Sequence, residues 1–321
     1  MAAERTCAVA MYHYIRDTAG TPFPTLNALS LSDFDAQVAF LGETRRVIGF
    51  DEFEAGLGGA ALPDETALLT FDDGVRDHLE ILPRLVARGI RGAFFVSGDT
   101  LGSQPRMLNV HKVHVLVARL GADTLLERLI RALPAEHVPE KAAEPAAPEL
   151  YRYDGLAART VKRLLNYVLP MDVAAGVLSE LFEAEFGSES AFARGFYLSE
   201  ADIVSMSRAG QTFGFHTDTH PVLSRLSRDD QRRELERGPA LIRDLTGQAH
   251  VPFCVPHGHL SSYNRDTVAL LAELGYAASF TVVREVARFG TASRFEVPRL
   301  DTKDMPPFAD VAGLRGAAAV P

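Results

Sequence analysis

The sequence has little of what three common classes of protein require. Its 321 residues include two cysteines, Cys7 and Cys254, which suggest neither a disulfide framework nor a thiolate metal site. The net charge is −9, and no block of lysine or arginine is long enough for a nucleic-acid-binding stripe. No apolar run approaches the roughly 20 residues of a membrane-spanning helix. We therefore expect no nucleic-acid partner and no membrane span.

The beginning of the sequence is typical of a core strand. The apolar stretch from Cys7 to Tyr14 is short, contains His13 and is not followed by a small-residue cleavage site, as a signal peptide would be. We therefore expect a cytoplasmic protein. Hydrophobic residues make up 47% of the chain and charged residues 23%, which is the composition of an ordinary soluble globular protein.

Short apolar runs followed by helical patterns recur along the chain. Ala67–Phe71 precedes a predicted helix at about 77–88, and Thr212–Phe215 precedes one at about 229–245. The later part continues with apolar runs at Phe253–Val255, Ala278–Val282 and Glu296–Leu300 and with a helix at about 265–274. This alternation favours an α/β fold built from βα units around a parallel sheet or barrel.

The segment from about 104 to 196 breaks this alternation. Val110–Leu120, Thr124–Leu133 and Ala157–Leu169 have helical patterns, and no strand is predicted among them. Pro134–Leu150 is rich in Ala, Pro and Glu, which predicts a linker or mobile loop. We expect residues 1–321 to form one barrel domain in which residues 104–196 are an insertion. Such an insertion can roof the active face or form a homo-oligomer contact.

Two carboxylates stand at the end of one predicted strand. In Thr70–Gly74, Asp72 and Asp73 follow an apolar run and precede a glycine. Catalytic side chains of α/β barrels stand at such strand ends. Neighbouring side chains diverge, so one aspartate can bind a metal while the other faces substrate as a base. Taken alone, the motif is more often a solvated turn or a helix N-cap.

Two histidines follow another predicted strand. They are His216 and His220, within Phe215–Pro221. With one aspartate they can form a set of two histidines and one carboxylate that leaves positions open for water and substrate. A pair of surface or capping histidines is the alternative for this segment alone. Because both motifs follow predicted strands, we expect them on the same face of the barrel.

Both motifs resemble those of the polysaccharide deacetylase family, also called NodB-homology or carbohydrate esterase family 4. The family motifs read Thr-Phe-Asp-Asp-Gly and His-Ser/Thr-x-x-His, and both are intact here. The resemblance covers about residues 7–101 and 198–301. It implies a distorted (β/α)7-type barrel with a helical insertion and a hydrolase of non-peptide carbon–nitrogen bonds. It also implies that Asp72 is the general base and that Asp73, His216 and His220 hold a divalent metal, usually Zn²⁺.

Three further residues are candidates by weaker resemblance. His257 stands where the family's Pro-Tyr-Gly element donates a backbone N–H to the oxyanion; its imidazole contacts substrate, adds a proton donor or is only a polar loop group. His13 ends a Met-Tyr-His element found in one subset of the family, and is either the general acid or a buried histidine bonded to a carbonyl. Arg299 lies in a segment that resembles that subset's closing strand, and either orients Asp72 by a bidentate contact or forms a structural ion pair.

The sequence also departs from the family pattern. It has no tryptophan, which the fourth family motif contains. No histidine follows His259, although the fifth motif supplies a late histidine that protonates the leaving amine. His111 and His114 admit a second metal site, but a helix-surface pair without a carboxylate partner is the preferred interpretation.

These patterns predict a metal-dependent deacetylase. We expect hydrolysis of an N-acyl amide, in particular N-acetyl, on an amino sugar or glycan precursor, with Asp72 activating the water. A deformylase or a hydrolase of a small non-sugar amide would use the same site. A non-catalytic glycan-binding barrel is the remaining alternative, and fold and motif alone do not select among substrates.

Overall fold

The computed structural model describes residues 5–139 and 154–309. Its centre is a sheet whose strands pair in the order β7-β6-β5-β4-β3-β1-β8, with β2 beside β3 and β9 beside β1. All pairs are parallel except β1 with β8. The strands are β1 Thr6–Tyr12, β2 Arg46–Val47, β3 Glu65–Phe71, β4 Ala93–Val96, β5 Thr212–Phe215, β6 Phe253–Cys254, β7 Ser279–Phe280, β8 Ala287–Arg288 and β9 Leu300–Asp301.

The sheet closes on itself through the segment that ends in β9. Leu300 pairs with Ala10 of β1, and Val297, just before β9, forms a parallel bridge with Phe280 of β7. The parallel strands β1, β3 to β7 and β9 therefore surround a common interior. This confirms the predicted distorted (β/α)7-type barrel.

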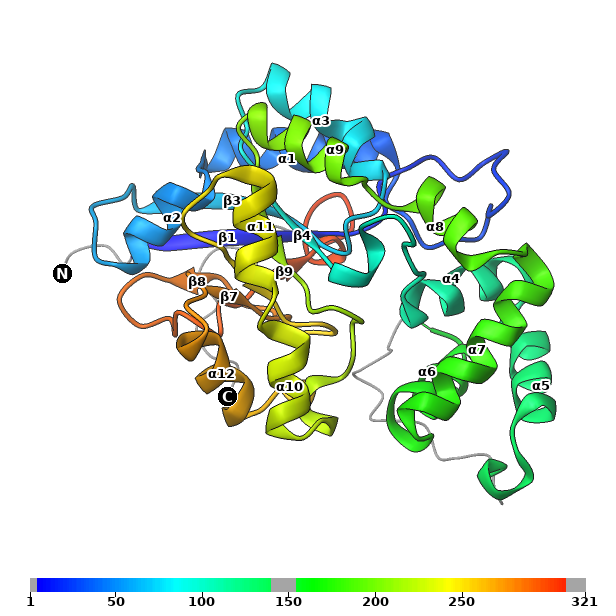
Figure 1. Cartoon of the computed structure of the whole chain (residues 1–321). Helices are drawn as coiled ribbons and strands as arrows, with labels where there is room; N and C mark the ends of the chain where they lie inside the picture. Colours follow the sequence, from blue (N-terminus) through cyan, green and yellow to red (C-terminus); the bar gives the residue numbers. More distant parts are fainter. Residues whose placement is uncertain (1–4, 140–153, 310–321) are drawn as a thin grey trace, which may run out of the picture.

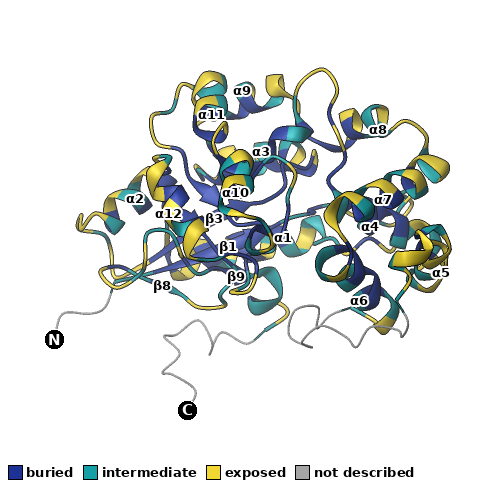
Figure 2. Ribbon diagram, turned by 60° about the horizontal axis from the view of Figure 1, so that its bottom comes forward, coloured by how far each residue is buried: buried dark blue, intermediate teal, exposed yellow. Residues whose placement is uncertain are grey.

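The strands are apolar on both faces because both faces are buried. In β1, Ala10 and Tyr12 pack toward the outer helices, whereas Cys7 and Val9 belong to the cluster inside the barrel. Successive side chains of a strand point to opposite faces, so one continuous apolar run serves both layers. Figure 2 shows the buried strands enclosed by helices whose outer faces are exposed.

Helices flank the barrel strands in sequence. They are α1 Leu31–Thr44, α2 Phe50–Leu57, α3 Asp77–Ala87, α9 Glu200–Arg208, α10 Arg228–Leu235, α11 Gly238–Thr246 and α12 Arg265–Glu273. The single helix predicted at about 229–245 is wrong, since this stretch forms α10 and α11. Pro239 stands at the start of α11, where its missing N–H is tolerated, and would interrupt a continuous helix.

A group of helices between β4 and β5 occupies the predicted helical segment. They are α4 Asn109–Leu120, α5 Ala122–Ala132, α6 Leu156–Arg163, α7 Met171–Phe186 and α8 Glu189–Phe196, with a π-helical turn at Leu164–Val168. They share a hydrophobic cluster of their own. Figure 1 shows them beside the barrel on the side away from the N-terminus. We call residues 104–196 the helical segment.

The prediction of no strand in the helical segment holds for its described residues. Of the loop predicted at Pro134–Leu150, residues 140–150 lie outside the described residues. The division into one barrel domain with an insertion stays a prediction. No described helix combines the length and apolarity needed to cross a bilayer.

Candidate active site

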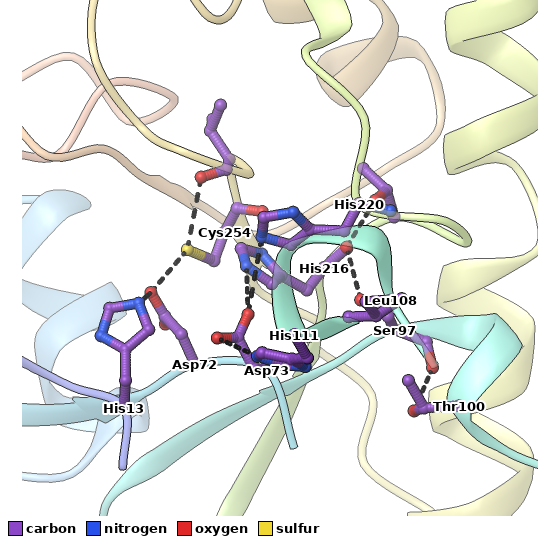
Figure 3. A network of polar contacts seen from close by, with 12 residues as sticks. His13, Asp72, Asp73, Ser97, Thr100, Leu108, His111, His216, His220 and Cys254 are labelled. Carbon is purple, nitrogen blue, oxygen red and sulfur yellow. Dashed lines mark hydrogen bonds and ion pairs between the residues drawn. The ribbon is translucent and has the colours of Figure 1, made fainter. Parts of the chain in front are cut away.

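Three predicted metal ligands converge where β3 and β5 end. Asp73 follows β3, and His216 and His220 follow β5 (Figure 3). The Oδ1 atom of Asp73 lies 3.3 Å from Nε2 of His216 and 3.5 Å from Nε2 of His220. All three side chains are almost fully buried. Parallel strands thus bring together residues that are more than a hundred positions apart in the sequence.

The backbone around these ligands is held in the left-handed region. Among the described residues, the non-glycine positions with positive φ are Asp73 (73°), Thr217 (63°), His220 (61°) and His257 (61°). Such conformations cost about 1–3 kcal/mol each and persist where the surroundings impose them. Gly74 continues the turn, and a Cβ added to it would lie 2.9 Å from a methyl group of Val96. The motif's glycine therefore allows the aspartates to sit directly against β4.

A cation fits the three ligands. Nδ1 of His216 lies 2.7 Å from the carbonyl oxygen of Cys254, so Nδ1 donates to that carbonyl and Nε2 is the nitrogen that faces Asp73. Oδ1 of Asp73 is buried and accepts no hydrogen bond from the part of the chain that the structure describes. A buried carboxylate oxygen without a hydrogen-bond donor is stabilised by a positive charge beside it. Two imidazoles and a carboxylate are ligands that suit zinc.

The electrostatics of the histidines also favour a positive charge at this point. Burial opposes protonation of His216, yet Cys254 and the Asp73 carboxylate raise its pKa well above the ordinary value. Burial, together with the neighbouring His257 and His216, lowers the pKa of His220 well below the ordinary value. The surroundings therefore favour one positive charge on the ligand set and disfavour protonation of both histidines at once.

Arg299 forms a bidentate contact with Asp72, which was one of the two interpretations of Arg299 from the sequence. Nη1 and Nη2 of Arg299 donate to Oδ1 and Oδ2 of Asp72, each at 2.8 Å. Nε of Arg299 donates to the carbonyl oxygen of Thr281 at 3.0 Å, which fixes the plane of the guanidinium. Burial alone would raise the pKa of Asp72, but the Arg299 guanidinium lowers it below its ordinary value. Asp72 is therefore ionised and held in one orientation.

Cys254 contacts both members of this pair, a role that its sequence context does not predict. Its Sγ lies 3.4 Å from Oδ2 of Asp72 and 3.1 Å from Nη2 of Arg299. Burial raises the pKa of the Cys254 thiol, so it stays protonated and donates to the carboxylate. Its position at the end of β6, level with the other strand ends, is the signal that could have identified it.

His13 and His257 flank the site on different sides. Nε2 of His13 lies 3.7 Å from Oδ2 of Asp72, and the side chain is 42% exposed. The His257 ring lies 4.8 Å from that of His220, between ring centroids. Burial lowers the pKa of His257 to about 3, with His259 as the next cause. The backbone N–H of His257 has no acceptor among the described residues.

The interpretation of His111 and His114 as a surface pair without a carboxylate partner is wrong. His111 is fully buried, and its Nε2 lies 3.0 Å from Oδ2 of Asp73. Nδ1 of His114 lies 3.2 Å from the hydroxyl of Tyr14, which stands just past β1. The face of α4 that carries both residues packs against the barrel. The helix therefore buries side chains whose exposure could not be decided from the sequence pattern.

The helical segment covers the site. A cavity of about 490 Å³ is lined by His13 and Asp301 of the barrel and by His114 of α4 and Lys162 of α6. Another, of about 270 Å³, is lined by His220 and His257 together with residues of α4 and α7. A third, of about 180 Å³, shares His257 with one and His114 and Lys162 with the other. Cavities on both sides of the site thus have walls from both parts of the chain.

Several solved structures share this fold. A deacetylase of Streptococcus pyogenes, PplD, in complex with acetate is 17% identical with a TM-score of 0.58, over 95% of each chain. IcaB from Ammonifex degensii is 20% identical with a TM-score of 0.57, over 92% of this chain and 91% of that one. The deacetylase domain of BpsB from Bordetella bronchiseptica is 16% identical with a TM-score of 0.53, over 92% and 95%.

Sequence comparison adds a narrower match. No curated protein matches the chain. The family model described as polysaccharide deacetylase matches residues 185–279, which include His216, His220 and His257. Together with the shared fold, this match makes the chain similar to polysaccharide deacetylases, which are hydrolases of carbon–nitrogen amide bonds.

Proposed function

We propose that this protein removes an N-acyl group, most simply an acetyl group, from an amino sugar or glycan precursor in a metal-dependent reaction. The observation that carries the proposal is the pairing of two different carboxylates at one strand end. Asp73 faces two imidazoles, and its Oδ1 has no donor among the described residues. The charge of Asp72 is balanced by Arg299, which also fixes the orientation of the carboxylate. One site therefore offers both a metal position and an adjacent base.

Asp73, His216 and His220 would hold the cation, as their atoms lie within 4.8 Å of one another. A divalent cation there, most simply Zn²⁺, supplies acidification of a water molecule and polarisation of the substrate carbonyl. Asp72 accepts the proton of the attacking water. Its Oδ1 accepts from Arg299 alone among the described residues, which leaves a lone pair for this proton. The N–H of His257, which has no acceptor among the described residues, donates to the oxyanion.

His13 is the proton donor to the leaving amine in this proposal. Its side chain is accessible, lies beside Asp72 and lines the cavity of about 490 Å³. His257 is less suited to this role, because it lies on the His220 side and burial disfavours its protonated form. This arrangement would replace the late histidine that the sequence lacks.

The size of the cavities and the walls that the helical segment gives them favour a small substrate over a polymer. Volumes of about 490 and 270 Å³ suit one or a few sugar units. A small amino-sugar metabolite or biosynthetic precursor would also agree with the cytoplasmic location that we propose. A deformylase or a hydrolase of small non-sugar amides remains the second candidate, because the ligand set and base are common to all three reactions.

The test combines metal analysis with one substitution. Purified protein should contain about one divalent cation per chain, and Asp72→Asn should keep that cation while losing hydrolysis by a factor of at least about 100. Asp123→Asn, on the exposed face of α5, is the matched control and should behave like the wild type. N-acetyl, N-formyl and non-sugar amide substrates, compared side by side, identify the acyl group. Protein without metal, or an Asp72→Asn variant of full activity, would contradict the proposal.

A further inference from the structure

A helix outside the barrel reaches the metal position. His111 lies in the first turn of α4, the first helix of the helical segment, and its side chain is fully buried. Its Nε2 lies 3.0 Å from Oδ2 of Asp73, the oxygen that does not face the two histidine ligands (Figure 3). One carboxylate is thus shared, with Oδ1 turned to His216 and His220 and Oδ2 turned to the helical segment.

Hydrogen bonding fixes the direction of this contact. The backbone N–H of Leu108 donates to the hydroxyl of Tyr197 at 3.0 Å, and that hydroxyl lies 2.7 Å from Nδ1 of His111. A carboxylate can only accept, so the contact with Oδ2 of Asp73 requires the hydrogen of His111 on Nε2 and leaves Nδ1 to accept the hydroxyl proton of Tyr197. Nδ1 is then the acceptor, Nε2 carries the hydrogen, and His111 donates to Asp73. Each polar atom from the N–H of Leu108 to Oδ2 of Asp73 thus has a partner.

The chain of contacts is anchored at both ends of the helical segment. Leu108 immediately precedes α4, and Tyr197 immediately follows α8. Tyr197 pairs with Val75 in an isolated bridge, and the N–H of Leu198 donates to the carbonyl of Gly74 at 2.8 Å. The helical segment therefore ends against the turn that carries Asp73, and its start is tied to that end through the hydroxyl of Tyr197. Its position relative to the carboxylate is set by backbone hydrogen bonds and not only by side-chain packing.

We propose that His111 is a positioning residue for the metal site, which the helical segment supplies to the barrel. By donating to Oδ2 it holds the Asp73 carboxylate so that Oδ1 faces His216 and His220. The inference rests on the proposed function, because it assigns His111 to the cation that Asp73 would bind. It also gives the helical segment a part in building the site, in addition to covering it.

The test measures Zn²⁺ binding to metal-free protein by calorimetry. Partners that orient a metal ligand are typically worth about 10–100-fold in affinity, so His111→Ala should weaken Zn²⁺ binding by that factor. His111→Gln should restore most of it, because its side-chain amide can donate to Oδ2. Leu116→Ala is the matched control: Leu116 is buried in the same helix, in the hydrophobic cluster of the helical segment, and should leave the affinity unchanged. The absorption spectrum of Co²⁺ in the site should change in His111→Ala and not in Leu116→Ala.

The outcomes separate this inference from the proposed function. Wild-type protein that binds no divalent cation would overturn both. Wild-type protein that binds Zn²⁺, with His111→Ala binding it equally tightly, would overturn the inference alone. If His111→Ala does not fold, Tyr197→Phe takes its place, since it removes the hydroxyl that links Nδ1 of His111 to Leu108 and holds the imidazole in position. Equal affinity of Tyr197→Phe and wild type would then overturn the inference, and a several-fold weaker affinity would support it.

Discussion

At the scale of single residues, the most consequential contact is the one between Asp72 and Arg299. Both side chains are almost fully buried, and the guanidinium also donates to the carbonyl oxygen of Thr281 and to Sγ of Cys254. We expect Arg299→Met to lower the free energy of unfolding by about 3–5 kcal/mol, because it leaves a buried carboxylate without its partner. Urea unfolding followed by circular dichroism measures this loss.

A double substitution tests the stated cause. In Arg299→Met combined with Asp72→Leu, no unpaired charge remains, so much of the lost stability should return while activity stays absent. If the double variant is as unstable as Arg299→Met alone, the lost packing of Arg299 and not the stranded charge of Asp72 is responsible.

Residues next to strand ends were the ones that could be predicted. Asp72, Asp73, His216 and His220 each follow an apolar run, and the shared edge of parallel strands brings them together. His111 could not be placed in the same way, because its partner Asp73 is 38 positions away in a different kind of structure. A usable signal was present: His111 and Val115 lie one helical turn apart on an apolar face, where a polar side chain needs a partner.

At the scale of elements, α11 depends on a glycine at its first position. A Cβ added to Gly238 would lie 2.3 Å from both a ring carbon of Phe215 and the hydroxyl oxygen of Tyr276. Phe215 ends β5 and directly precedes His216. Gly238→Ala should therefore destabilise the protein by a few kcal/mol through overpacking, and should weaken metal binding by displacing His216.

A second helical glycine serves as the control. Gly176 lies inside α7, and a Cβ there would meet nothing within 4 Å. Gly176→Ala should stabilise the protein by about 0.5–1 kcal/mol through helix propensity. Thermal unfolding of both variants gives the comparison. A Gly238→Ala variant as stable as Gly176→Ala would show that α11 does not need to approach β5 so closely.

Strands β1, β3 and β5 were predicted more accurately than the two-residue strands β7 and β9. The runs at β1, β3 and β5 gave the strands nearly to the residue. β7 and β9 are only two residues long, and their pairing depends on loop hydrogen bonds such as that from the N–H of Thr281 to the carbonyl of Val297 at 2.8 Å. A residue pattern does not contain such contacts, so the closure of the barrel had to come from the structure.

At the scale of the whole molecule, metal binding should stabilise the fold. A ligand that binds only the folded state, at about 100 times its dissociation constant, adds roughly 2.7 kcal/mol. Removing the metal with a chelator should therefore lower the melting temperature by several degrees. Asp73→Asn should have a lower melting temperature that the chelator no longer changes. A chelator effect of the same size in both proteins would place the stabilising cation elsewhere.

The closure of the barrel also bears on the order in which the molecule forms. Ala10 and Leu300 stand side by side, yet almost the entire chain separates them. Contacts between such distant residues make folding slow, because the entropy of closing the loop is lost before the contact forms. Arg299 belongs to that closing stretch. During synthesis, Asp72 and Asp73 leave the ribosome more than two hundred residues before the arginine that neutralises one of them. Asp72 therefore lacks its arginine partner until the closing stretch has been synthesised, and the complete site can form only after that.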